Sequence, residues 1–348
     1  MHKTSQRVTE GLWTVMLLLT CAHFSLAYNN RTNPFLNMAD YAAGHAALPY
    51  QARVLMAWIL HWAAPLPATL KLVVHAHGFI RDSFEAVLLI TSLLSMIITI
   101  WATRRSLTAL TGDEAFARWS SFLVLWMSYF VLVLPYGLSY SLPYDVPSLA
   151  FFSIGLMLVV EQRGSFLPLL VAIGSLNRET ICFVTLFYAI WEWKRLDHLV
   201  PLQRLQKILP LTVLQAAVWI AVKLWLRGHF SHNLTEHEGN GLFQTVLSRN
   251  LHFLVNPAQW PLLASLFGFL WPILFLGRKQ LYPASLRAAI VILIPAWIAV
   301  MMVVGIIVEI RVFSELSDLV ALAVGVIAYH RWILPARRGL QAVTSPVK

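Results

Sequence analysis

The sequence contains little charge for its length. Only 12% of its 348 residues are Asp, Glu, Lys or Arg, whereas soluble proteins carry about 25%. This deficit excludes an ordinary soluble globular enzyme. Instead, 58% of the residues are hydrophobic, the mean hydropathy is +0.67, and apolar runs recur along the whole chain. We therefore predict an all-α polytopic membrane protein.

The sequence also lacks a cysteine framework and the common motifs of soluble enzymes. No P-loop, GxGxxG turn, HExxH pair or GxSxG elbow occurs, so nucleotide hydrolysis and the usual hydrolase mechanisms have no support. The two cysteines lie far apart in apolar runs and predict neither a disulfide nor a metal site. The histidines and acids within 227–256 match no metal-ligand spacing. No cofactor is expected, and a divalent metal has no sequence support.

About ten membrane segments are expected from the apolar runs and from the length that a bilayer requires. Three of them, at 146–160, 166–176 and 180–193, are shorter than a full span, which predicts broken or tilted helices around an internal cavity. Residues 52–62 are expected to form an amphipathic interfacial helix. The other segments lie at 11–28, 84–102, 119–138, 208–226, 258–276, 286–308 and 312–330.

The chain is expected to form one transmembrane domain over residues 1–335, followed by a short basic cytoplasmic tail at 336–348. The first apolar run resembles a signal peptide, but its length favours a retained helix. Most of the 26 Lys and Arg residues fall on one side of this topology, which predicts that both termini are cytoplasmic. The net charge of +10 is therefore attributed to membrane orientation, and nucleic acid is not an expected partner.

On this topology, the polar motifs that membrane orientation does not explain lie on the external face. The first is Asp40, in the loop after the first apolar run, with Arg53 downstream. A carboxylate beside the membrane surface is suited to act as a general base toward a hydroxyl group. The alternatives are a solvated acid or helix cap for Asp40 and a snorkelling cation for Arg53.

The second motif is the sequence YDVPS, which contains Tyr144 and Asp145 and opens a short apolar segment. Asp145 stands at a typical N-cap position, with Pro147 in the first helical turn, so capping is one reading. A contact to substrate is the other. Tyr144 is suited to stack on a sugar ring or to mark the membrane interface.

The third motif, Asn177-Arg178-Glu179, lies between two apolar runs, where charge is costly unless it faces a cavity or water. Asn177 is suited to cap the next helix, and Glu179 suits the helix N-terminus. Arg178 gains nothing from that position. It is therefore expected either to hold an anionic ligand or to form a structural pair with Glu179 or Glu309.

The last motif runs from Glu309 into the final apolar segment. Arg311, Glu315 and Asp318 are spaced at i, i+4 and i+7, which predicts one polar stripe facing the protein interior. The planar guanidinium of Arg311 is suited to hold a phosphate or diphosphate while Glu315 and Asp318 orient it. A purely structural charge network is the alternative.

Together these motifs resemble the GT-C superfamily of integral-membrane glycosyltransferases, particularly small bacterial members of cell-surface polysaccharide pathways. The resemblance spans residues 1 to about 330. It rests on Asp40, PYQAR at 49–53, YDVPS at 144–148, NRET at 177–180 and EIR at 309–311. The first external loop lacks the acidic pair of many members, so the resemblance does not imply metal dependence.

The resemblance implies transfer of a sugar from a polyprenyl-phosphate donor to a glycan or lipid-linked acceptor, on the periplasmic face of a bacterial inner membrane. Asp40 would be the general base of an inverting displacement, and Arg178 and Arg311 would neutralise the departing phosphate. The other candidates would bind or orient substrate: Arg53, Tyr144, Asp145, Asn177, Glu179, Glu309 and Glu315. The competing hypotheses are a transporter or flippase for a lipid-linked or anionic substrate and a non-catalytic membrane scaffold.

Overall fold

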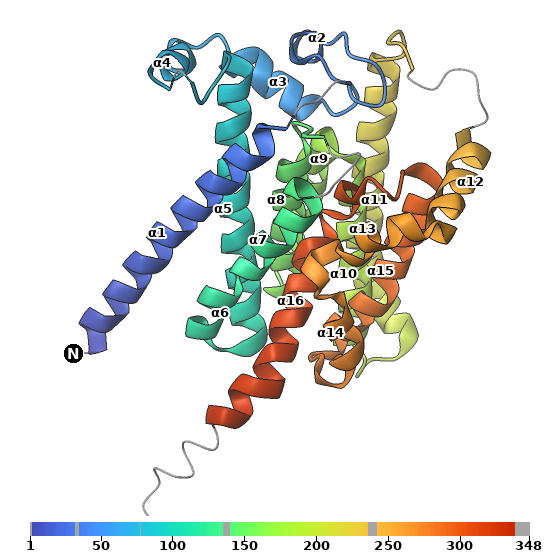
Figure 1. Ribbon diagram of the computed structural model, residues 1–348. Helices are drawn as coiled ribbons and strands as arrows, with labels where there is room; N and C mark the ends of the chain where they lie inside the picture. Colours follow the sequence, from blue (N-terminus) through green and yellow to red (C-terminus); the bar gives the residue numbers. More distant parts are fainter. Residues whose placement is uncertain (1, 32–34, 77, 135–139, 236–241, 338–348) are drawn as a thin grey trace, which may run out of the picture.

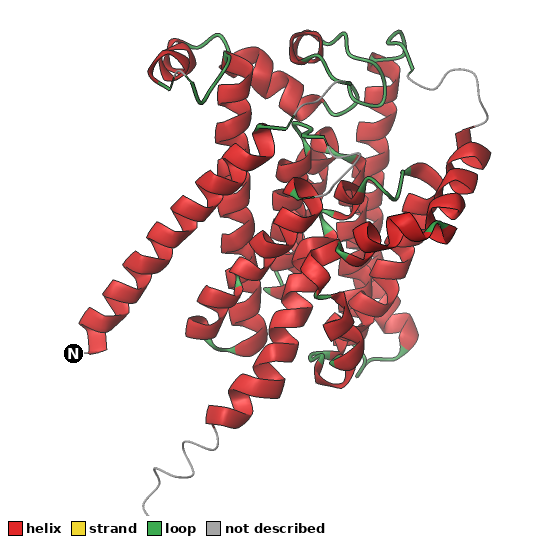
Figure 2. Ribbon diagram, in the orientation of Figure 1, coloured by secondary structure: helices red, strands yellow, loops and turns green. Residues whose placement is uncertain are grey.

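The computed structural model describes residues 2–31, 35–76, 78–134, 140–235 and 242–337, and these residues are mainly helical (Figure 1; Figure 2). The described residues contain no β-strand apart from an isolated bridge between Leu48 and Thr235. The all-α prediction is therefore confirmed. Most of the predicted tail, residues 338–348, lies outside the described residues.

Six helical stretches in the described part are long and apolar enough to cross a bilayer. They correspond to six of the ten predicted segments, so a multi-pass membrane protein is supported but the count of ten is not confirmed. These stretches are Arg7–Asn29 within α1 (His2–Asn29), α5 (Ser83–Thr111), Glu114–Val133 across α6 (Glu114–Ser120) and α7 (Phe122–Ser128), α11 (Pro201–His229), α15 (Ala284–Val304), and Leu316–Arg337, which begins with α16 (Leu316–Ala328).

The three segments predicted to be short are short helices near the centre of the bundle. They are α8 (Asp145–Val160), α9 (Leu167–Asn177) and α10 (Cys182–Arg195). α8 packs against α5, α9 and α10, and α10 also packs against α11 and α15. Because neighbours surround it, nearly every side chain of α8 is buried. The start of α8 and the end of α9, which carry Asp145 and Asn177, are therefore buried within the protein.

The predicted span at 258–276 is not a continuous helix. It follows α12 (Leu242–Val255) and is divided into α13 (Trp260–Ala264), a 3-10 turn (Leu266–Phe269) and α14 (Trp271–Leu276). Within the turn, Phe267 and Gly268 adopt left-handed backbone angles, with φ of 54° and 64°. Left-handed residues cannot continue a right-handed helix, so this segment is broken despite its apolar composition.

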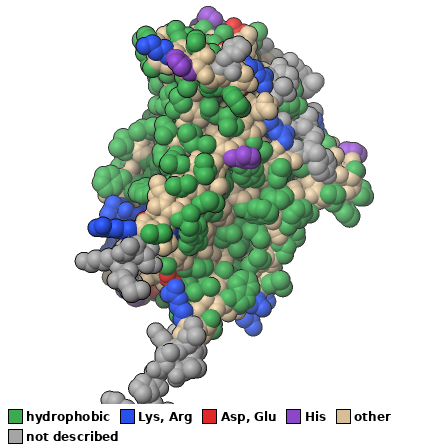
Figure 3. Space-filling model, turned by 60° about the vertical axis from the view of Figure 1, so that its left-hand side comes forward, with side chains coloured by type: hydrophobic (Ala, Val, Ile, Leu, Met, Phe, Trp, Pro, Cys, Tyr) green, Lys and Arg blue, Asp and Glu red, His purple; other side chains and the backbone are tan. Residues whose placement is uncertain are grey.

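The two ends of the bundle differ (Figure 1). α2 (Met38–Ala43), α3 (Val54–Ala63) and α4 (Pro67–His75) gather at one end, and the first turns of α1 and the last turns after α16 lie at the other. α3 matches the helix predicted at 52–62, and a bend of 81° separates it from α4. Hydrophobic side chains cover most of the face between the ends (Figure 3), as expected for a surface in contact with lipid.

Candidate active site

Asp145 is the centre of a buried charge cluster. It lies in the first turn of α8 and is completely buried. One carboxylate oxygen is 3.3 Å from Nη1 of Arg178, and the other is 3.5 Å from Nη1 of Arg311. The hydroxyl of Tyr28, near the end of α1, lies 3.2 Å from this carboxylate and 2.9 Å from the carbonyl of Leu142, and these two acceptors share its proton. The N-cap residue of α8 is Tyr144, so Asp145 links two arginines and does not cap the helix.

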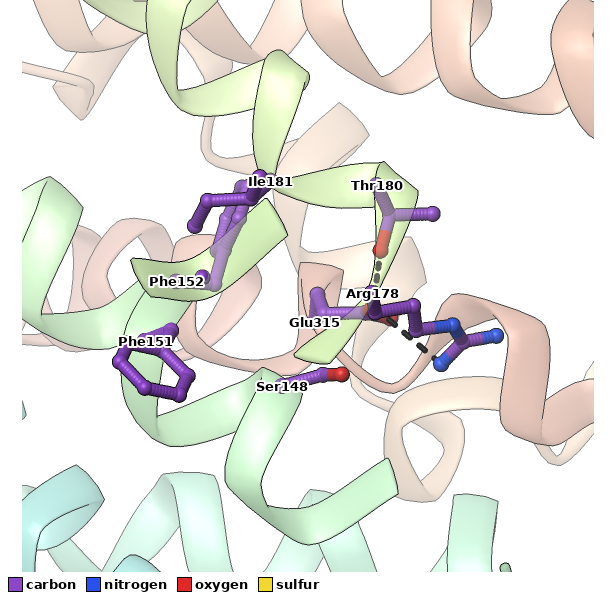
Figure 4. Close-up of a pocket in the computed structure, with 8 residues that line it drawn as sticks. Ser148, Phe151, Phe152, Arg178, Thr180, Ile181 and Glu315 are labelled. Carbon is purple, nitrogen blue, oxygen red and sulfur yellow. Dashed lines mark hydrogen bonds and ion pairs between the residues drawn. The ribbon is translucent and has the colours of Figure 1, made fainter. Parts of the chain in front are cut away.

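Arg178 is buried in the link between α9 and the 3-10 turn η3 (Glu179–Ile181). Besides Asp145, it contacts Glu315, with 3.2 Å between Nη1 and Oε1. The hydroxyl of Thr180 donates to the same oxygen of Glu315 at 2.6 Å (Figure 4). A void of about 10 Å³ adjoins these side chains, which is room for at most one water molecule. This side of Arg178 is therefore closed to a larger ligand.

Glu179 pairs with Arg53 at the start of α3, with 2.8 Å between Nη2 and Oε1. Lys223 of α11 is 3.3 Å from the other carboxylate oxygen. Burial favours the neutral acid, but the charges of Arg53 and Lys223 outweigh it and hold the pKa of Glu179 well below its ordinary value. The predicted Arg178–Glu179 pair does not form. Arg178 has an extended backbone, so successive side chains diverge.

Arg53 also contacts Tyr144. Its guanidinium carbon lies 4.2 Å from the centre of the Tyr144 ring, a favourable cation–π distance. Tyr41 of α2 donates its hydroxyl proton to the backbone carbonyl of Arg53. The arginine is thus fixed on three sides, by Glu179, by an aromatic face and by its own backbone.

Glu309 and Arg311 follow the end of α15 and pair with each other. Since Arg311 also reaches Asp145, its guanidinium lies between two carboxylates. The predicted alternative pair between Arg178 and Glu309 is not among the ion pairs of the described residues. Each of these two arginines has an acidic partner from a different segment of the chain.

Glu315 and Asp318 are buried inside the protein as predicted, but the predicted single helical stripe through Arg311, Glu315 and Asp318 is wrong. Residues Ile310–Phe313 form a 3-10 turn, and α16 begins only at Leu316, so the helical spacing of i, i+4 and i+7 does not apply. Asp318 lies inside the bundle and accepts a hydrogen bond from Thr103 of α5 at 2.6 Å. It does not orient Arg311.

Asn177 has a supporting role in the cluster. Its buried amide donates to the backbone carbonyl of Tyr144 at 3.0 Å and to the hydroxyl of Ser148 at 2.8 Å. These bonds join the end of α9 to the start of α8. The expectation that Asn177 caps the following helix is therefore wrong, because its side chain points back to α8.

One cavity of about 410 Å³ adjoins the cluster. Its charged lining in the described part of the chain consists of four arginines and one carboxylate, namely Arg53, Arg178, Arg249, Arg311 and Glu309. The Nε groups of Arg178 and Arg311 are buried and have no hydrogen-bond acceptor among the described residues. Buried donors normally have partners, and guanidinium groups match phosphate oxygens in geometry and charge. The cavity is therefore suited to a phosphate-bearing ligand.

Arg249 and Asn250 of α12 are site residues that the sequence did not reveal. Arg249 lines the cavity. The buried amide of Asn250 donates to the carbonyls of Met302 and Gly305 at 3.0 and 2.6 Å, and its oxygen accepts from the backbone of Ile307 at 3.1 Å. Asn250 thus joins α12 to the cavity wall that follows α15. The only sequence signal was a polar run of three residues, Ser248, Arg249 and Asn250, between apolar residues, which resembles any amphipathic helix.

The structure does not bring Asp40 into the cluster. It is an exposed residue of α2, where Asn37 provides the N-cap, and it is not among the residues that line the cavity. Its helix nevertheless contacts a residue of the lining, because Tyr41 of α2 donates to the backbone carbonyl of Arg53. The amide of Gln51 donates to the carbonyl of Tyr41 at 3.4 Å, and nearby Tyr50 lines the cavity.

No group of three or more His, Cys, Asp or Glu side chains in the described residues is arranged to hold a metal ion. Comparison of the chain with protein-family models, with curated proteins and with solved structures gave no match. The geometry of the site is therefore the basis for any functional assignment.

Proposed function

We propose that this protein is a membrane glycosyltransferase that takes a sugar from a polyprenyl-phosphate donor and transfers it to a glycan or lipid-linked acceptor in cell-surface glycan synthesis. The observation that carries the proposal is the cavity of about 410 Å³ with four arginines in its wall. A cavity of this size accommodates a small ligand. Its charge suits a phosphate, and its location within a membrane protein suits a phosphate attached to lipid.

In the proposed reaction, Asp40 accepts the proton of an acceptor hydroxyl. The freed oxygen then forms a bond to the anomeric carbon while the bond from that carbon to the phosphate oxygen breaks. The electron pair remains on the departing polyprenyl phosphate. Arg178 and Arg311 stabilise the added negative charge, and Arg53 and Arg249 contribute to the same field.

The carboxylates of the cluster are proposed to position these arginines. Asp145 contacts Arg178 and Arg311, and Glu309 contacts Arg311. Held in this way, the guanidinium groups need little reorganisation when charge develops on the phosphate, which is the condition for efficient electrostatic stabilisation. Glu179 and Glu315 perform the same task for Arg53 and Arg178.

The second candidate is a transporter of a lipid-linked or anionic substrate. It is favoured by the short central helices, since transporters bind substrates where helices are interrupted. For both candidates we propose a bacterial inner membrane, with the termini cytoplasmic and the arginine cavity toward the periplasm. In Figure 1, the start of α3, which carries Arg53, lies toward the end opposite the first turns of α1.

A turnover assay in detergent separates the two candidates, because micelles offer no second compartment for transport. The purified protein would receive polyprenyl-phosphate sugars and acceptor glycans extracted from membranes, and mass spectrometry would follow the lipid. We expect release of free polyprenyl phosphate. In Asp40→Asn the rate should fall by about 10²- to 10⁴-fold, as for loss of a general base. In Glu309→Gln the rate should fall by a smaller factor, because Arg311 loses a carboxylate that positions it.

Two outcomes would contradict these assignments. Binding of the glycosylated lipid without any turnover would favour the transporter. Full activity in Asp40→Asn, together with loss of activity in Glu309→Gln, would make Glu309 the base, since Glu309 is the carboxylate that lines the cavity in the described part of the chain.

A further inference from the structure

A second, larger cavity lies between the broken α13–α14 segment and α15. Its volume is about 730 Å³, and it shares no lining residue with the arginine cavity. The walls are apolar. The charged residues of the lining lie close together in the sequence, just before α15 and in its first turns. The lining includes Phe267, Trp271, Phe275, Val291, Ile294 and Ile298 on the walls, and Arg278, Lys279 and Arg287 as the charged residues.

The backbone break described above accounts for this groove. Gly268 packs so closely against α7 that a Cβ atom at this position would lie 2.3 Å from Nε1 of Trp126. The chain turns at this contact and continues as the short α14, and residues on both sides of the turn line the groove. The wall is open, with Phe275 and Val291 69% and 65% exposed.

The three cations place positive charge beside the apolar part of the groove. Arg278 and Lys279 form most of a 3-10 turn (Arg278–Gln280), and Arg287 lies in the first turns of α15. All three are exposed, and none forms an ion pair with a carboxylate among the described residues. The Nε group of Arg287 donates a hydrogen bond to the carbonyl of Leu281 at 3.4 Å. An apolar slot that leads to unpaired positive charge complements an anionic amphiphile.

We propose that this groove binds an anionic phospholipid of the surrounding bilayer. The phosphate headgroup contacts Arg278, Lys279 and Arg287, and an acyl chain covers the apolar walls. Basic pockets between membrane helices recognise anionic headgroups in this way. A zwitterionic lipid carries its own cation beside the phosphate, which the three basic side chains would repel, and a second copy of this chain in a symmetric dimer would bring the same cations toward each other. α14, which carries part of the lining, lies toward the end of the bundle where α1 begins (Figure 1).

Native mass spectrometry of the detergent-purified protein tests this proposal. The probes are dioleoyl phosphatidylglycerol and dioleoyl phosphatidylcholine, which share acyl chains and differ in charge. We expect the wild type to prefer phosphatidylglycerol, and the double variant Arg278→Gln/Lys279→Gln to lose roughly 30-fold of this preference. The control is Lys207→Gln/Arg331→Gln, which removes the same charge from exposed sites outside the groove and should keep the preference.

A second variant tests the apolar part of the site. Val291→Trp places a large side chain in the groove, whereas Val300→Trp changes an exposed position of the same helix outside it. Only Val291→Trp should reduce phosphatidylglycerol binding. The proposal would be overturned if the groove variants and their controls preferred phosphatidylglycerol equally. It would also be overturned if the wild type showed the mass of a dimer and no lipid adduct, and if Val291→Trp abolished that dimer.

Discussion

Individual charged residues in this protein are stabilised by partners on other segments of the chain. Asp145 on α8 contacts Arg178 after α9 and Arg311 after α15. A buried charge without a partner costs several kcal/mol, whereas a paired one is tolerated. The same pairs that allow these arginines to be buried also direct them into the cavity. On the proposed function, structural and functional roles therefore coincide in these residues, and a single substitution should affect both.

Arg178→Ala should lower the free energy of unfolding by about 3–5 kcal/mol, because it leaves the buried Glu315 without its cation and leaves Asp145 with Arg311 alone. The matched control is Arg163→Ala. It removes an exposed arginine that is 3.5 Å from Glu161, and it should cost no more than about 1 kcal/mol. Denaturant unfolding in detergent, followed by circular dichroism, measures both. Equal stability of the two variants would contradict the buried network.

At the scale of helices, the site is built where helices are interrupted. Arg178 follows α9, Glu309 and Arg311 follow α15, and Asp145 lies at the start of α8. Interruptions leave backbone groups and side chains free to face a cavity inside an otherwise apolar bundle. The break between α13 and α14 has the same effect in a different place, since it leaves the cationic groove open. Backbone breaks thus account for both cavities.

Gly268→Ala should destabilise the protein, because the new Cβ atom would collide with Trp126 and because φ is +64° at this position. The backbone strain alone costs about 1–3 kcal/mol. Gly11→Ala is the control, since a Cβ atom there has no neighbour within 4 Å. In a helix this change is expected to be neutral or to stabilise by about 0.5–1 kcal/mol. Thermal unfolding in detergent compares them, and an unchanged midpoint in Gly268→Ala would contradict the close contact.

For the whole molecule, the sequence predicted composition-driven features well and contacts poorly. The apolar runs predicted an all-α membrane protein, and six of the seven longer predicted segments and the three short ones correspond to helical stretches of the structure, because hydrophobic length follows directly from sequence. The continuous span at 258–276 was wrong, since a left-handed turn at Phe267 and Gly268 has no hydropathy signal. The count of ten segments is accordingly not confirmed.

In the candidate site too, the sequence predicted which motifs are involved but not how their residues pair. The motifs containing Arg53, Asp145, Arg178 and Arg311 do meet in one cluster. Which acid pairs with which arginine was not predictable, because those pairs join segments far apart in sequence and depend on how helices pack. Tyr28 and Arg249 were missed because neither stands in a distinctive motif, and their places in the site also depend on how the helices pack. The functional role of Asp40 stays a prediction.

The most direct test of the account is whether the arginine cavity holds the phosphate of a lipid. Native mass spectrometry would compare retention of a polyprenyl phosphate with that of the corresponding polyprenol, in the wild type and in Arg249→Gln. Arg249 lines the cavity without an ion pair to a carboxylate among the described residues, so its removal leaves no buried acid unpaired. Arg227→Gln, at an exposed position near the end of α11, is the control.

We predict that the wild type retains the phosphate and not the alcohol. Arg249→Gln should weaken retention by roughly 10- to 100-fold, the contribution of a hydrogen bond between charged groups, while Arg227→Gln should leave it unchanged. Equal retention of the phosphate and the alcohol, or a phosphate preference that Arg249→Gln does not alter, would contradict the assignment of this cavity as the donor site.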